Sequence, residues 1–177
     1  MSCINYCNDP LLQYTVESCG EYSNGGIESF VIFACGFEPV NPSSGVEIQA
    51  IIDAGNAVKI SGVKVGIPAA SPITQDSPTS CGVSRTTNFD RTATIYDANL
   101  NATNNAFWNS ANTNTFGAVL FFNCDANDAF YVNPPSGVSV QVSPLIPDTN
   151  TEFRRYEGQL SWRHINVPQL VAKAIIT

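Results

Sequence analysis

Apolar residues divide the chain into short segments of β-strand length. The run Ile27–Cys35 is apolar on both faces and rich in β-branched and aromatic residues, which predicts a strand buried on both sides. Phe116–Cys124 is the most apolar run, and we expect it to be a central strand. Other segments alternate apolar and polar residues, as half-buried strands do. These are Val46–Asp53, Val58–Val65, Thr86–Tyr96, Ala129–Val132, Gly137–Ser143 and, less regularly, Thr151–Ile165.

One short helix is predicted between two of these strands. Asn101 or Thr103 is a suitable N-cap for a helix that runs to about Asn109. Phe107 and Trp108 would anchor this helix to the sheet. Asparagine is a poor helix former, so tertiary packing must hold the helix in place.

The connections complete the predicted organisation. Val46–Asp53 and Val58–Val65 are expected to form a hairpin, and the proline-rich segment Gly66–Gly82 is expected to be a long loop that serves as an interaction arm. Composition is even throughout, which favours a single domain over residues 1–177. Its parts are an extended arm (1–26), a β-sandwich core (27–165) and a C-terminal extension (166–177) that is either a strand or a short helix. The predicted fold class is mainly β, a β-sandwich or partly closed barrel with one short helix packed on its side.

The composition argues against a nucleic-acid reader. Charged residues make up only 13% of the chain, and the formal net charge is -7. The densest basic spot is the pair Arg154 and Arg155, which is too small to neutralise a phosphate backbone. A surface rich in Asn, Ser and Thr and poor in charge suits a protein surrounded by copies of itself.

Six cysteines invite a disulfide or zinc interpretation, and both are weak. They are Cys3, Cys7, Cys19, Cys35, Cys81 and Cys124. Only Cys3 and Cys7 form a close pair, which does not supply the four ligands of a structural zinc site. The first ten residues contain no secretory leader pattern and no apolar run reaches the ~20 residues of a membrane helix, so we expect a soluble chain with reduced thiols.

No group of residues in the sequence forms a recognisable catalytic, cofactor or metal motif. Asp97, Asn99 and Asn101 begin like a calcium-binding loop, but the required Gly and final Glu are replaced by Ala102 and Trp108, so turn and helix-cap roles fit better. His164 has no nucleophile motif near it, and the spatial separation of Glu152 and Glu157 is not given by sequence. Tyr156, Trp108 and Trp162 are expected in the core rather than in a ligand platform. We therefore expect a protein that is not an enzyme and needs no cofactor.

The order of predicted elements resembles the tail tube proteins of long-tailed bacteriophages. More narrowly, Cys3, Cys19 and the element Gly25-Gly26-Ile27 look like the opening of virion proteins from phages of Bacteroidota. The hairpin FGAVLFFNCDANDAFYV and the segment DTNTEFRRYEGQLSW lie where those proteins have their central hairpin and last strand. The proline-rich Gly66–Gly82 and the long segment after Ile165 depart from that pattern.

The resemblance implies a virion protein that self-assembles into stacked rings, with DNA passing through the channel without specific binding. Its partners would be copies of itself and other virion proteins, and assembly would take place in the cytoplasm of the bacterial host. The acidic balance leads us to expect more carboxylates than basic groups on the channel wall. The alternatives are a capsid decoration or head-associated protein and a secreted disulfide-linked binding domain.

Overall fold

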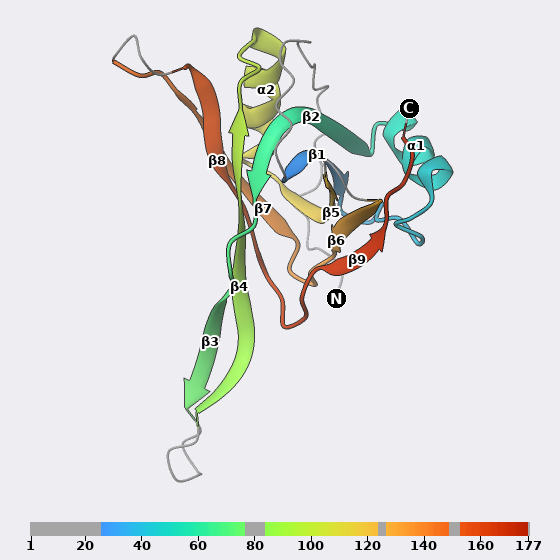
Figure 1. Ribbon diagram of the computed structural model, residues 1–177, viewed down its shortest axis with the longest axis vertical. Helices are drawn as coiled ribbons and strands as arrows, with labels where there is room; N and C mark the ends of the chain where they lie inside the picture. The colour runs from blue at the N-terminus through green and yellow to red at the C-terminus, as the bar shows by residue number, and fades with distance from the viewer. Residues whose placement is uncertain (1–25, 77–83, 124–126, 149–152, 177) are drawn as a thin grey trace.

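The predicted mainly β fold is confirmed by a computed structural model, which describes residues 26–76, 84–123, 127–148 and 153–176. The described residues form nine strands and two short helices (Figure 1). The strands are β1 (Ile27–Ala34), β2 (Ala57–Gly66), β3 (Ser71–Asp76), β4 (Ser84–Asp97), β5 (Thr115–Asn123), β6 (Asp128–Val132), β7 (Val138–Leu145), β8 (Arg155–Arg163) and β9 (Gln169–Ala172). The helices are α1 (Gly45–Asp53) and α2 (Ala102–Ala111).

Six strands close into an antiparallel barrel in the order β1-β2-β4-β8-β7-β5, with β5 returning to β1. The closure is short, because β5 meets β7 only through the pairs Thr115–Ser139 and Phe116–Val138. Farther along, the same edge of β5 pairs with β6, and β6 pairs with β9. β3 is a side branch that pairs with β4. The sheet therefore has β3 and β9 as its terminal strands.

The barrel interior is filled by alternate residues of the six strands. Val138, Val140 and Val142 of β7 point inward and are buried, as their alternation predicted. On β8, Tyr156, Leu160 and Trp162 are likewise buried in the main core cluster. The prediction that these aromatic residues serve core packing is confirmed.

Helix α2 forms where it was predicted and packs into the end of the barrel. Asn101 is its N-cap, and the Asn101 side chain accepts a hydrogen bond from Asn104 N at 2.8 Å. Phe107 and Trp108 are 1% and 2% exposed and belong to the barrel core. The helix has weak intrinsic propensity, so this burial holds it.

Helix α1 corrects the prediction of a strand over Val46–Asp53. Ser44 caps the helix by accepting a hydrogen bond from Glu47 N, and the Glu47 carboxylate accepts from Val40 N at 2.6 Å and from Asn41 N at 3.1 Å. Buried Ile48 and half-buried Ile51 and Ile52 are spaced as one face of a helix. The alternation at residues 46, 48, 50 and 52 fits only a strand and passes over Ile51, whereas residues 48, 51 and 52 share a helix face and the Ser-x-x-Glu cap starts a helix. The predicted hairpin with β2 is consequently wrong, and β2 pairs with β1 and β4.

A second core lies between the outer surface of the barrel and two covering segments. Figure 1 shows α1 and the chain after β9 together on one side of the molecule. They cover outward residues of β1, β5 and β6, including Val31, Phe33, Leu120 and Tyr131. The predicted C-terminal extension thus contains a strand of the sheet, held also by the Lys173 amine, which donates to Asn123 O at 2.6 Å.

Tyr131 carries a buried hydroxyl into this second core. The side chain is 7% exposed and its hydroxyl has no hydrogen-bond partner among the described residues, although the Asn133 side chain lies near it. Burial is the largest cause, and with the negative charges of Glu38 and Glu47 it raises the pKa of Tyr131 to about 12, against a lowering by the Asn133 side chain. The neutral phenol is therefore the form that the fold favours.

We expect Tyr131 to make the protein less stable at alkaline pH. The unfolded phenol ionises near its ordinary pKa of 10.0, whereas the folded one stays protonated up to about 12. The contribution of the Tyr131 phenol to folding stability is thus fully present below pH 10 and is lost as the pH rises through about 12. Urea unfolding between pH 9 and about 12 should show this fall in the wild type and a smaller fall in Tyr131→Phe. Equal slopes in the two proteins would refute the assignment.

The predicted loop Gly66–Gly82 contains a strand that its prolines concealed. β3 pairs with β4 from Ser71–Asp90 to Asp76–Ser84, and it tolerates Pro72 because it is an edge strand. β3 and the first half of β4 form a two-stranded ribbon that projects from the barrel (Figure 1). The last part of the predicted arm, residues 77–82, lies outside the described residues, as do residues 1–25.

Candidate assembly surface

The calcium-like residues form a buried hydrogen-bond network at the junction of β4 and α2. Asp97 is 0% exposed, and its Oδ1 accepts from Asn99 N at 2.8 Å and from Asn99 Nδ2 at 3.0 Å. Its Oδ2 accepts from Trp108 Nε1 at 3.0 Å. Asn104 Nδ2 donates to Asn99 O, and burial together with the negative charge of Asp97 raises the pKa of Tyr156. The predicted turn and cap roles are confirmed, and the network orients α2.

In the part of the chain that the structure describes, the residues with possible chemistry are not brought together. Among the described residues, no group of three or more His, Cys, Asp or Glu side chains is placed to hold a metal ion. Cys35 Sγ donates to Thr115 O at 3.3 Å, and the other five cysteines lie outside the described ranges. Glu157 is bound by Arg155, at 3.0 Å from the guanidinium, and Glu152 is outside the described residues. No described helix is long and apolar enough to cross a membrane.

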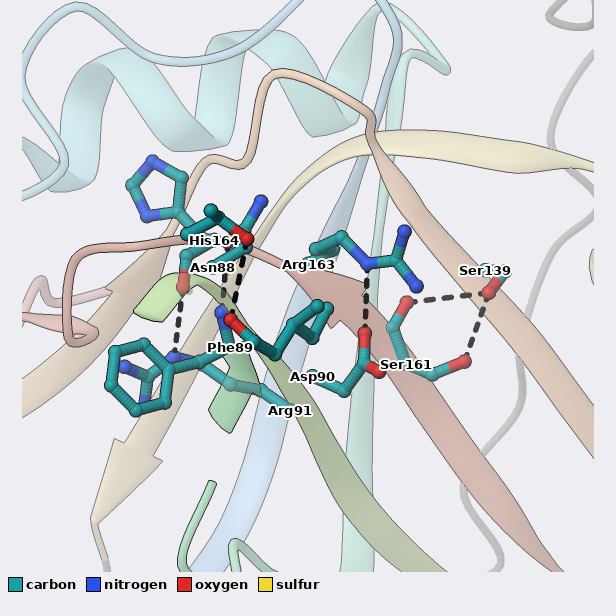
Figure 2. Close-up of polar contacts among 10 residues, drawn as sticks. Asn88, Phe89, Asp90, Arg91, Ser139, Ser161, Arg163 and His164 are labelled. Carbon is teal, nitrogen blue, oxygen red and sulfur yellow. Dashed lines mark hydrogen bonds and ion pairs between the residues drawn. The ribbon is translucent and has the colours of Figure 1, made fainter. Parts of the chain in front are cut away.

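His164 contributes its backbone rather than its imidazole to the structure. His164 N donates to Phe89 O at 3.1 Å, and His164 O accepts from Arg91 Nε at 3.4 Å. Figure 2 shows the imidazole pointing away from the hydroxyls of Ser139 and Ser161. These contacts fasten the end of β8 to β4, which is a structural role.

The outer surface of β4, β8 and β7 forms a continuous layer of polar side chains, which we call the polar face. It consists of Asp90, Thr92, Thr94, Tyr96, Ser139, Gln141, Ser143, Glu157, Gln159, Ser161 and Arg163. Residues of the three strands lie opposite one another in rows, such as Thr92–Ser161–Ser139 and Thr94–Gln159–Gln141. Short polar pairs of this kind stabilise neighbouring strands.

The charges on the polar face neutralise one another. Arg163 Nε donates to Asp90 Oδ1 at 2.9 Å (Figure 2), and Arg155, at the end of β8, donates to Glu157 Oε2 at 3.2 Å through Nε. Arg155 also lies over the ring of Tyr96, 5.3 Å from its centre. A shallow groove at the Asp90 end is lined by hydroxyls such as those of Thr92, Ser139 and Ser161. The face thus offers hydrogen-bonding groups without an excess of either charge.

Strand edges are left open on the projecting ribbon. β8 pairs with β4 from Asp97 to Asp90 and goes no farther, so no described strand pairs with the remaining edge of Ser84–Asn88. The outer edge of β3 also lacks a described partner strand, but Pro72 interrupts its row of N–H groups, so the free edge of β4 is the more open of the two. In the sequence of the ribbon, charged residues stand at Asp76 and Arg85, whereas Ser71–Gln75 and Thr86–Phe89 contain none.

The edge of β7 that faces away from β8, by contrast, is closed at Val142. Asn112 imitates a neighbouring strand there, because its Nδ2 donates to Val142 O at 2.7 Å and its Oδ1 accepts from Val142 N at 2.8 Å. Two residues farther on, Pro144 has no N–H to offer. Both devices prevent a further strand from adding at this position.

Among the described residues, six of the ten exposed large apolar side chains precede or follow β8, and the other four are Phe37, Val40, Val46 and Ile175. Three of the six residues come before β8 in the chain, and one of them, Leu145, pairs with its first residue, Arg155. They are Leu145, Ile146 and Phe153, which are 37%, 66% and 83% exposed, and we call them the tip cluster. After the last residue of β8, Ile165, Val167 and Leu170 are 56%, 73% and 59% exposed and form the base cluster. The projecting ribbon leaves the barrel at the base end, because Asp90 pairs with Arg163.

Comparison with known proteins identifies no relative of the chain. No protein-family model, no curated protein and no solved structure matches it. The function is therefore argued from the fold and its surfaces.

Proposed function

We propose that the protein is a virion structural protein whose copies assemble into stacked rings and form a phage tail tube for the passage of DNA. The observation that carries this proposal is the β3–β4 ribbon with its open edges. A two-stranded ribbon is marginally stable alone in water, and open edges are templates for pairing with another chain. The ribbon therefore fits a chain that is completed by its neighbours, as the resemblance to tail tube proteins implies.

The polar face is the surface best suited to line the channel. It has no exposed large apolar side chain in the rows between its ends, unlike the tip and base clusters. Asp90 and Glu157 are paired with Arg163 and Arg155, so the face is neutral rather than rich in carboxylates. A channel lined by this face would let DNA pass without binding. Its arginines are already paired with carboxylates, so they would not neutralise phosphates and release the counterions of DNA. The expected acidic excess would then lie elsewhere on the chain.

Electron microscopy of the purified protein tests the proposal. We expect hollow tubes or rings of uniform diameter, imaged by negative stain over a range of protein concentrations and at low and high salt. Monomers or trimers that bind only to capsids would favour the decoration alternative and contradict the tube.

A further inference from the structure

We propose that copies of the chain join head to tail, the tip cluster of one copy against the base cluster of the next, with β4 of one copy pairing beside β8 of the other. This inference rests on the proposed self-assembly and names the surfaces that carry it. The partner is a second copy of this chain, translated along the direction of β4 and β8.

The two apolar clusters lie too far apart for one symmetric contact to cover both. They flank the nine residues of β8, which span about 30 Å at the rise of a strand. A two-fold contact would bury one cluster of each copy against itself and leave the other exposed. A head-to-tail contact buries both clusters through a single kind of interface. Repeated from copy to copy, that contact produces an open stack.

The open strand edges complement each other under the same translation. At the base end, β4 continues past the end of β8 through Ser84–Asn88, with its β8-facing edge unpaired among the described residues. At the tip end, Arg155 continues past the end of β4 and pairs only with Leu145. A copy placed below another brings its Phe153–Arg155 beside the β4 edge of the copy above. The strands would meet antiparallel, as β4 and β8 do within one chain.

The translation has a length that the strands set. In this arrangement the β4 strands of successive copies lie on one line. The distance from one copy to the next is therefore at least the length of the 14-residue β4, which is about 45 Å. The axial repeat of the stack should be close to this value, reduced by the tilt of the strands to the axis.

Paired substitutions at the two ends test the contact. The tip variant carries Ile146→Asp and Phe153→Asp, and the base variant carries Ile165→Asp and Val167→Asp. A control variant carries Val40→Asp and Val46→Asp, whose side chains are 95% and 85% exposed on the α1 side. All of these side chains are exposed, so thermal unfolding should match the wild type. Assembly is measured by sedimentation up to about 1 mM chain, where even weak contacts form, and by electron microscopy.

We expect the control to stack like the wild type, and the tip and base variants each to stop at a single layer. A mixture of the two variants should give assemblies two layers thick, because one intact tip meets one intact base and growth then ends. Stacking by either variant alone would overturn the head-to-tail contact while leaving the tube intact. Open chains without a hollow tube, lost in both variants, would support the contact and refute the tube. A wild type that stays monomeric throughout would refute both.

Discussion

Replacing Asp97 by Ala should destabilise the protein more than any other single change at the junction of β4 and α2. The substitution leaves the N–H groups of Asn99 and the indole N–H of Trp108 without their acceptor in a site that is 0% exposed at residue 97. Each buried donor without a partner costs about 1–3 kcal/mol, so the total loss is on the order of 3–5 kcal/mol. That is a large fraction of the ~5–15 kcal/mol that stabilises an ordinary domain.

Urea unfolding followed by circular dichroism measures this loss, with Trp108→Phe as the matched variant. The smaller phenyl ring removes the indole donor and leaves a small cavity in the core, so it tests one hydrogen bond of the network at a cost that should still be smaller, about 1–3 kcal/mol. The account of the network is wrong if Asp97→Ala unfolds within about 1 kcal/mol of the wild type. It is also wrong if Trp108→Phe costs as much as Asp97→Ala.

Gly158→Ala should also cause a large loss of stability. Gly158 lies on β8 between Ile95 of β4 and Val142 of β7, and an added Cβ would meet the backbone oxygen of Gln141 and lie 2.5 Å from Val142 Cα. Backbone atoms cannot turn aside as a side chain can, so β7 must move. We expect a cost of about 3 kcal/mol, partly offset by the ~0.4–1 kcal/mol that alanine gains through the unfolded chain.

Gly66→Ala is the control for this prediction. Its Cβ would meet only the Thr94 hydroxyl, at 3.2 Å, which belongs to a side chain that can rotate. Its stability should stay within about 1 kcal/mol of the wild type in the same urea experiment. Similar losses for the two glycines would show that the approach of β7 to β8 does not depend on Gly158.

Local patterns predicted most strands correctly because one side of each strand is buried in the barrel. The inward valines of β7 and the aromatic residues of β8 were identified by alternation alone. Two elements were missed for physical reasons. The alternation over α1 fits a strand, whereas the helix face shared by residues 48, 51 and 52 and the cap formed by Ser44 and Glu47 favour a helix. Pro72 argued against a strand, yet β3 lies at an edge where a missing N–H costs nothing.

The surfaces that carry the proposal could not be predicted from the sequence. Pairing of β4 with β8 and of β1 with β5 joins segments far apart in the chain, and no local pattern encodes it. Ile146 and Val167 are ordinary apolar residues in the sequence, and only the fold shows that they are exposed at opposite ends of one strand. The hydrogen bonds of Asn112 to β7 likewise depend on tertiary structure.

A cryo-electron microscopy reconstruction of the assembled chain tests the central claim most directly. The account predicts a hollow tube of stacked rings in which the polar face of β4, β7 and β8 lines the channel. The tip cluster of each copy should lie against the base cluster of the next. A solid filament, closed dimers or trimers with no channel, or a channel lined by unpaired basic side chains would contradict it.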